Sequence, residues 1–422
     1  MKPLFLLPAR TGNPQPLLNT IPLALAVALP VGSAVAFFLW ALEGVIRIQW
    51  AHPALLWGLP LGGVAVGLLY HHFGKDSAKG NNLLIEEIHE PGGGVPARMA
   101  PLVLLGTLVT HLFGGSAGRE GTAVQMGGGI AGGLARIFKA GVENRRLMLM
   151  CGVAAGFGAV FGTPLTGAVF AMEVLVMGRM EYGALLPLLL ASLAGNATCA
   201  AWGIHHTVYH LEVPGAESGH GGFHGALWLK TALAGVCFGW AGRFFAALTH
   251  WLQRGFARMV PYAPLRPFAG GLLVIGLTLM LGTRDFLGLG VQAPPLGRVS
   301  ILSSFENGGA DPWSWLWKTV FTSVTVSSGF KGGEVTPLFY IGSTLGHTLG
   351  LILNGPVPLF AALGFIGVFA GAANTPLACT LMGIELFGAP WAAHFAVACF
   401  VAYACSGHSG IYRAQRLGVG KS

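Results

Sequence analysis

The chain has very little charge for its length. Only 9% of its 422 residues are Asp, Glu, Lys or Arg, whereas soluble domains have roughly 25%. The mean hydropathy is +0.65, and long apolar runs recur along the whole sequence. This composition excludes an ordinary soluble domain, and we predict an all-α polytopic membrane protein.

Cysteine is also scarce, and its spacing indicates no framework. The six cysteines lie in apolar segments without any CxxC pair, so neither a disulfide network nor a metal site is indicated. Histidines gather in one loop, at His205, His206, His210, His220 and His224. Their spacing matches no familiar ligand pattern, and such loops are usually only solvated. We therefore predict no metal and no cofactor.

Glycine, by contrast, is abundant. The chain has 66 glycines and 25 prolines, which predicts close helix contacts and interrupted helices of the kind that bind ions in transporters. The net charge of +8 indicates cytoplasmic loops near anionic lipid, not a nucleic-acid partner. Basic residues near both ends predict an inner-membrane protein with cytoplasmic termini; they are Lys2, Arg10, Arg413, Arg416 and Lys421.

The apolar runs predict helices that cross or enter the lipid bilayer. They cover residues 22–45, 53–70, 99–113, 147–177, 185–202, 226–250, 268–282, 313–328, 337–353, 357–387 and 391–404. The run 147–177 is broken at Gly162-Thr163-Pro164. A polar stretch, 71–96, contains Gly80-Asn81-Asn82-Leu83, which predicts the start of a short helix. That start is either an anion site or a solvated loop with an Asn cap.

One stretch, Gly114–Thr122, carries an Arg-Glu pair among glycines inside this apolar chain. An ionisable group within a membrane segment is costly unless function retains it. Glycines allow backbone N–H groups to face an open space, as at helix starts that bind anions. We predict an anion site here, with Glu120 as a carboxylate that competes for it.

The sequence contains an internal repeat. Thr-Pro-Leu followed by Glu occurs at Thr163–Glu173 and again at Thr375–Glu385, at an offset of 212. At an offset of 214, Gly115, Gly118, Glu120, Thr122, Gly128 and Gly132 fall on Gly329, Gly332, Glu334, Thr336, Gly342 and Gly346. We predict two related halves, 1–210 and 211–422, with Glu120 and Glu334 facing one site at their interface.

These residues resemble the CLC family of chloride channels and proton-coupled anion transporters. Gly118–Thr122 is similar to the family's GREGP motif, Gly80–Leu83 stands where GSGIP is usual, and Gly333–Pro337 stands where GxFxP is usual. Tyr412 takes the place of the pore-lining tyrosine. The resemblance implies a CLC-type fold of two inverted halves and a homodimer with one pore per subunit. It also implies no cytoplasmic regulatory domain, since the chain ends at Ser422.

The departures resemble the fluoride-transporting branch of that family. Asn81 replaces the serine that normally contacts chloride, and Glu334-Val335-Thr336 brings in a carboxylate where the usual pattern is apolar. The resemblance implies a fluoride/proton antiporter that exports cytoplasmic fluoride, with Glu120 as the gate and proton carrier. It implies anion-binding residues at Asn81, Gly118, Arg119, Gly121, Glu334, Val335, Thr336 and Tyr412.

The chemistry of fluoride suits this set. Fluoride holds water strongly, so a site that strips it needs firm hydrogen-bond donors. Asn81 offers an amide, Thr336 a hydroxyl and a protonated Glu334 an O–H. The internal proton acceptor of many exchangers would fall on Val174, which leaves the internal proton route unexplained.

Other functions stay open at this point. A chloride-selective exchanger or passive anion channel is the nearest alternative. An intramembrane hydrolase using Ser116 or Ser409 lacks a recognisable nucleophile spacing, and a scaffold does not explain paired intramembrane glutamates, so we do not expect an enzyme. Glu173 and Glu385 are interpreted as structural. Lys331 either concentrates anions at a vestibule or is merely solvated.

Overall fold

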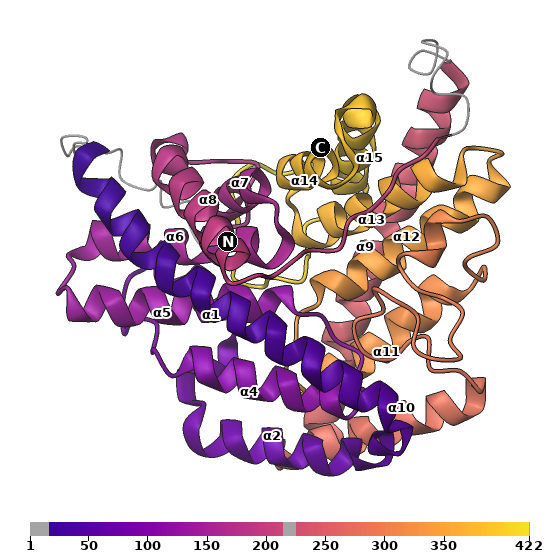
Figure 1. The fold of residues 1–422 in the computed structure, drawn as a ribbon, viewed down its shortest axis with the longest axis horizontal. Coiled ribbons are helices and arrows are strands. Elements are labelled where there is room, and N and C mark those ends of the chain that lie inside the picture. The colour runs from indigo at the N-terminus through magenta and orange to yellow at the C-terminus, as the bar shows by residue number, and fades with distance from the viewer. Residues whose placement is uncertain (1–16, 214–224, 422) are drawn as a thin grey trace.

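The structure, a computed structural model, describes residues 17–213 and 225–421 and is built almost wholly of helices (Figure 1). The first half contains α1 (Leu17–Ala51), α2 (Leu59–Phe73), α3 (Asn81–His89), α4 (Met99–Leu112), α5 (Glu120–Ile137), α6 (Val142–Phe161), α7 (Pro164–Glu173) and α8 (Leu185–Ala201). The second contains α9 (Gly225–Met259), α10 (Arg266–Leu281), α11 (Ser314–Ser328), α12 (Val335–Ile352), α13 (Val357–Ala373), α14 (Pro376–Phe387) and α15 (Ala392–Cys405).

Shorter elements join these helices. Short 3₁₀ helices occupy Pro53–Gly58, Lys75–Lys79, Tyr182–Ala184, Ala263–Leu265, Ser303–Phe305 and Ala389–Trp391. Two short strands, β1 (Val176–Met177) and β2 (Arg416–Leu417), pair in parallel. This pairing holds the end of the chain against the segment that follows α7. Two residues of the histidine-rich loop, His220 and His224, lie outside the described residues. So do the N-terminal basic residues Lys2 and Arg10.

The order of elements in the first half recurs in the second. Each half opens with a helix of 35 residues, α1 and α9, and places an 18-residue helix after its glycine-rich loop, α5 and α12. In Figure 1 the indigo-to-magenta half lies beside the orange-to-yellow half. The predicted all-α fold with repeated halves is confirmed.

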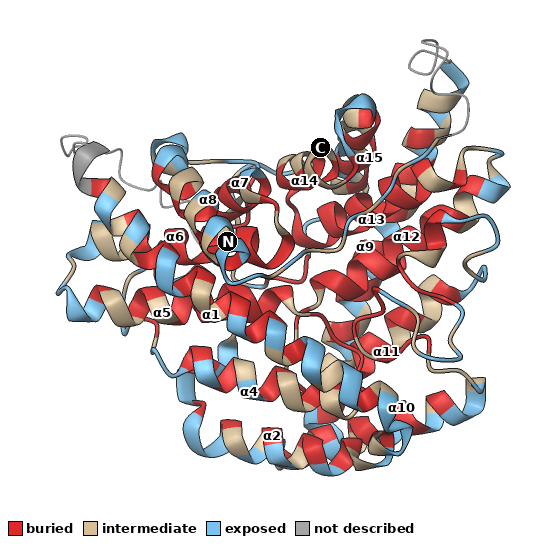
Figure 2. Ribbon diagram, in the orientation of Figure 1, coloured by how far each residue is buried: buried red, intermediate tan, exposed pale blue. Residues whose placement is uncertain are grey.

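Five helical segments of the described chain are long and apolar enough to cross a membrane. They are Thr20–Ala51, Pro53–Phe73, Tyr182–Ala201, Gly225–Met259 and Ala263–Leu281. Among the other helices, α13, which is hydrophobic all round, is buried along nearly its whole length (Figure 2). A helix without a polar face is expected at such a central position.

Broken helices appear where Thr-Pro interrupts the long apolar runs. α6 ends before Gly162, which has φ +75°, and α7 begins with Pro164 at its first position. The predicted run 357–387 is divided in the same way, because Asn374 takes a left-handed conformation and Pro376 opens α14. Proline suits a first helical position, where its missing N–H leaves no hydrogen bond unmade.

Aromatic rings fill the region where the halves meet. Phe157 and Phe170 stack in the first half with centroids 4.3 Å apart, and Phe369 of the second half lies 6.0 Å from Phe170. Phe339 stacks on Phe365 at 3.9 Å. This apolar packing supports the loops that precede α5 and α12.

Candidate anion and proton site

The loops that precede α5 and α12 are paired backbone to backbone. The N–H of Gly118 donates to the carbonyl of Gly333, and the N–H of Gly333 donates to the carbonyl of Gly118 at 2.7 Å. A Cβ on Gly333 would lie 2.8 Å from the nitrogen of Gly121, so only glycine permits this approach. The pairing sets the starts of α5 and α12 face to face.

This pairing corrects the repeat alignment by one residue. Gly118 and Gly333 are equivalent, so the residue preceding α5, Arg119, corresponds to Glu334, which precedes α12. Glu120 corresponds to Val335. The predicted match of Glu120 with Glu334 was wrong, because glycine-rich sequence gives identities in either register.

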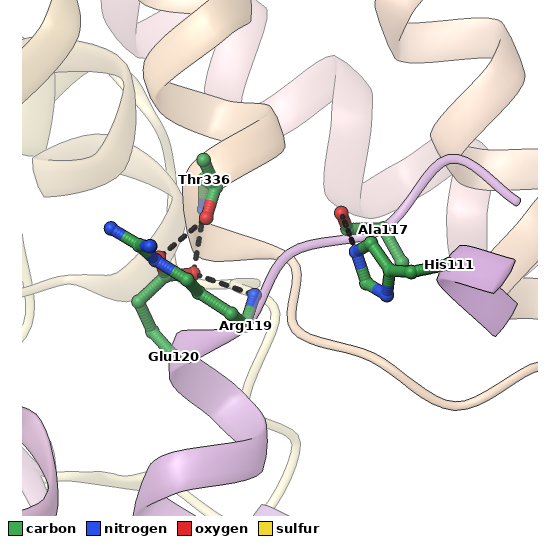
Figure 3. Close-up of polar contacts among 5 residues, drawn as sticks. All are labelled: His111, Ala117, Arg119, Glu120 and Thr336. Atoms are coloured by element: carbon green, nitrogen blue, oxygen red, sulfur yellow. Dashed lines mark hydrogen bonds and ion pairs between the residues drawn. The ribbon is translucent and has the colours of Figure 1, made fainter. Parts of the chain in front are cut away.

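Glu120 fills the space between the helix starts. Its side chain is 1% exposed. The backbone N–H of Arg119 donates to Oε2 at 3.1 Å, the N–H of Thr336 donates to Oε2 at 3.0 Å, and the Thr336 hydroxyl donates to Oε1 (Figure 3). The carboxylate is thus held by donors from both halves, as a bound anion would be.

Further donors lie beside it. The N–H groups of Gly121 and Val335, in the first turns of α5 and α12, meet no acceptor in the described chain, as is usual for a helix start. The N–H of Gly118 differs, because it already donates a hydrogen bond to the carbonyl of Gly333. Gly118, which the sequence predicted as an anion ligand, therefore pairs the two loops, and its N–H group is not free to bind an anion.

Asn81 faces this site from α3. Its Nδ2 lies 3.3 Å from the position that a Cβ on Gly121 would take, and its Oδ1 is buried without a hydrogen-bond partner. No Asn side chain caps α3, whose N-cap is Gly80 at φ +60°. The neighbouring Asn82 instead accepts a hydrogen bond from the N–H of Ala414 at 3.0 Å, a contact that the sequence did not predict.

Glu334 and Tyr412 complete the group. Glu334 is half-buried and immediately precedes α12. Tyr412 is 8% exposed, packs edge-on against Phe170 at 6.3 Å, and lies within electrostatic range of both Glu334 and Glu120. Residues of both halves and of the C-terminal segment thus lie near Glu120.

His111 supports the loop before α5, a role that sequence reasoning missed. Its Nδ1 lies 2.9 Å from the carbonyl of Thr107. Its Nε2 lies 3.1 Å from the carbonyl of Ala117 (Figure 3). The Thr107 hydroxyl pairs with that of Thr122 at 2.7 Å. These contacts fasten the glycine-rich loop and the first turn of α5 to α4.

A vestibule leads towards Glu120. It has a volume of about 1080 Å³, and Arg47, Arg119 and Arg284 line it together with a single carboxylate, Glu43. A smaller cavity of about 10 Å³ lies against Glu120, with Arg119, Thr336 and aromatic side chains in its wall. A wall richer in arginine than in carboxylates attracts anions.

Comparison with known proteins identifies the family. The family described as voltage gated chloride channel matches residues 62–407. The chain belongs to this family. A chloride/fluoride channel protein of Pseudomonas syringae pv. tomato is 50% identical to this CLC chain over 404 residues, which cover 94% of this chain and 87% of that protein. A putative chloride channel protein ClcB-like of Ralstonia nicotianae is 28% identical and covers 77% of this chain and 76% of its own.

Solved structures share the CLC fold. A CLC-type fluoride/proton antiporter superposes with a TM-score of 0.89 at 35% identity, covering 95% of this chain and 98% of its own. A slow cyanobacterial Cl⁻/H⁺ antiporter gives a TM-score of 0.76 at 21% identity over 93% of this chain and 96% of its own. That second similarity shows the fold alone.

The remaining candidates fall elsewhere in this CLC chain. Ser116 pairs with the Thr322 hydroxyl at 2.9 Å and not with a histidine, and Ser409 is exposed. In the described ranges, no three His, Cys, Asp or Glu side chains are grouped to hold a metal ion. Lys331 lies 4.1 Å from the ring centroid of Tyr70 and lines neither of the two cavities.

Proposed function

We propose that the protein is a fluoride/proton antiporter that exports cytoplasmic fluoride, with Glu120 as its gate and proton carrier. The observation that carries the proposal is the position of the Glu120 carboxylate. It accepts hydrogen bonds from the Thr336 hydroxyl and from the backbone N–H groups of Arg119 and Thr336. An anion bound between the starts of α5 and α12 would use the same donors.

Competition for these donors links the anion to the proton. Ionised Glu120 receives charge-assisted hydrogen bonds and blocks the site. When Glu120 binds a proton, those hydrogen bonds weaken because neutral acceptors are poorer, and an anion can replace the carboxyl group. Release of the proton restores the carboxylate, which then expels the anion. Each anion passage therefore requires a protonation cycle of Glu120.

The donor set favours fluoride. The Thr336 hydroxyl and the free N–H groups of Val335 and Gly121 belong to the facing starts of α12 and α5, and the Asn81 amide lies beside Gly121. Hydrogen bonds to a charged acceptor contribute about 1.5–3 kcal/mol each. A small anion with a tightly held water shell gains most from such donors. Two relatives above 30% identity are named for fluoride, which supports this choice.

Glu334 and Tyr412 extend the same proposal towards the cytoplasm. Tyr412 lies near both Glu334 and Glu120, and Val174, where a proton-accepting glutamate is usual in the family, is a buried apolar residue. We assign proton exchange on the inner side to Glu334, with the Tyr412 hydroxyl as a neighbouring donor. An inward proton gradient would then drive outward fluoride movement, and the protein acts as a transporter and not as an enzyme.

A chloride-selective exchanger or a passive channel is the second candidate. The name of the P. syringae relative, which includes both chloride and channel, favours it. Initial efflux of fluoride and of chloride from proteoliposomes, each recorded with a pH probe, separates the possibilities. The proposal expects fluoride efflux with counter-moving protons and little chloride efflux. Comparable chloride efflux contradicts the fluoride selectivity, and fluoride efflux without protons contradicts the antiport.

The assembly and orientation belong to the same proposal. We place the boundary between the halves at residues 210 and 211, and propose a homodimer in the inner membrane with one pore in each subunit. The anionic inner leaflet attracts the basic C-terminal residues Arg413 and Arg416, so we place the termini in the cytoplasm. Chemical crosslinking in membranes and protease protection of tagged termini test these assignments.

A further inference from the structure

The vestibule and the small cavity against Glu120 share a neck. Arg119, His206, Thr207 and Val291 line both cavities. An anion that moves between the vestibule and Glu120 passes these side chains. His206 belongs to the segment 203–213, which follows α8 and lies outside the predicted spans.

Two buried nitrogen atoms at this neck make no hydrogen bond. Nε of Arg119 and Nε2 of His206 are both shielded from solvent and have no hydrogen-bond partner in the described chain. Nε of Arg119 lies 3.5 Å from Oε1 of Glu120, which is longer than a good N–H···O hydrogen bond. Buried polar groups are nearly always paired, so Nε2 of His206, together with Nε of Arg119 when Glu120 is protonated and its ion pair with Arg119 weakens, is suited to an anionic acceptor.

The His206 ring is held in place by the end of α6. A Cβ on Gly162 would lie 2.6 Å from Cδ2 of His206, so the ring rests directly on a backbone that has no side chain. Gly162 has φ +75°, a conformation that also favours glycine. His205 and His210, on either side of the ring, are exposed. Among the described histidines of this group, only His206 lines both cavities.

The chemistry of the neck favours brief binding. Burial above all, together with the charges of Arg119 and His205, lowers the pKa of His206 to about 4. His206 is therefore neutral near pH 7 and acts as an N–H donor in the tautomer with hydrogen on Nε2, while Arg119 supplies the charge. Ion pathways need sites strong enough to attract an ion and weak enough to release it.

The size of the cavity restricts the ligand. Its volume of about 10 Å³ is close to the minimum that holds one water molecule. A monatomic anion of similar size fits, whereas a polyatomic anion such as phosphate does not. Phe161 and Phe339 in the wall offer no replacement for a hydration shell.

We propose that Nε of Arg119 and Nε2 of His206 form an outer anion subsite for a single halide ion, where the anion exchanges water for protein donors before or after it meets Glu120. This subsite rests on the proposed anion transport. It assigns one member of the histidine group a place in the pathway.

The test compares His206→Phe, which keeps a ring and removes the donor, with His206→Gln, whose amide Nε2 restores a donor. His210→Phe is the matched control, because His210 is exposed and lines neither cavity. The fluoride concentration that gives half-maximal initial flux is measured in proteoliposomes. We expect His206→Phe to raise it about tenfold, the equivalent of about 1.4 kcal/mol, while His206→Gln and His210→Phe stay within about twofold of the unchanged protein.

Each variant gives a result that either supports or overturns the proposed subsite. An unchanged half-saturating concentration in His206→Phe overturns the subsite, and an equal defect in His206→Gln assigns the effect to ring packing and overturns the donor role. If the unchanged protein carries no fluoride, the proposed function fails separately. Calorimetric titration of the same purified variants with sodium fluoride then still tests the subsite, which predicts weaker binding in His206→Phe alone.

Discussion

Glu173 of α7 caps the start of α14, and Glu385 of α14 caps the start of α7. Each carboxylate thus caps the helix that carries the other. Glu173, at the end of α7, accepts hydrogen bonds from the N–H groups of Leu377 and Ala378 at 3.0 and 2.8 Å, in the first turn of α14. Glu385, in α14, accepts them from Leu165 and Thr166 at 2.9 and 2.8 Å, in the first turn of α7. Each carboxylate thus satisfies the free donors of a helix that begins with proline.

This reciprocal contact predicts a loss of stability without a loss of transport chemistry. Glu173→Gln or Glu385→Gln turns an ionised double acceptor into a neutral amide whose NH₂ faces the N–H groups. We expect each to cost about 1–3 kcal/mol. Thermal unfolding in detergent measures the loss, with exposed Glu306→Gln as the control. Unaltered melting of Glu173→Gln together with lost proton coupling would instead place Glu173 in the proton route.

Thr336→Val tests the hydroxyl that both Glu120 and the anion would use. Valine keeps the shape and removes the donor to Oε1. We expect the half-saturating fluoride concentration to rise about 10–100-fold, because a hydrogen bond to a charged group is lost. Thr336→Ser retains the hydroxyl and should stay near the unchanged protein. Equal behaviour of the Val and Ser variants would remove the hydroxyl from the site.

Asn81→Ser tests the amide on the opposite side. The shorter hydroxyl supplies fewer donors to the position beside Gly121, so fluoride over chloride discrimination should fall, measured as the ratio of initial effluxes. Asn82→Ser is the control, because Asn82 bonds the backbone of Ala414 and should affect stability without changing that ratio. An unchanged ratio in Asn81→Ser would show that Asn81 is not a ligand.

Gly333→Ala tests the pairing of the loops. The added Cβ would meet the nitrogen of Gly121 at 2.8 Å, which forces the starts of α5 and α12 apart. We expect little folded protein and no transport. Gly276→Ala in α10, where a Cβ meets nothing within 4 Å, should fold normally and gain up to about 1 kcal/mol in stability. Normal transport by Gly333→Ala would mean that the close approach is not required.

The sequence predicted the helical repeat and the glycine-rich stretch Gly114–Thr122 as the site, because glycine spacing and isolated charges are local signals. It placed Glu120 opposite Glu334 in the wrong register, since only the Gly118–Gly333 pairing distinguishes the two alignments. The sequence also predicted a structural role for Glu173 and Glu385, which agrees with their contacts. That each one caps the helix of the other half depends on tertiary packing and could not be predicted.

Some residues gave no usable signal before the fold was known. His206 could not be separated from exposed neighbours such as His205, because its burial depends on Gly162, which lies far away in sequence. Lys318 looked like any residue in an apolar run. It is fully buried, and its ammonium group donates to the carbonyls of Phe286 and Gly288 at 3.2 and 2.8 Å, which fixes the loop that lines the vestibule.

The central claim is that Glu120 couples fluoride to protons. Its most direct test follows external pH while fluoride leaves proteoliposomes whose interior is the more acidic side, with membrane potential clamped by valinomycin and potassium. The account predicts that fluoride efflux drives protons inward against their gradient, and that Glu120→Gln abolishes this proton movement while exposed Glu143→Gln retains it. Fluoride efflux without uphill proton uptake in the unchanged protein, or undiminished coupling in Glu120→Gln, would contradict it.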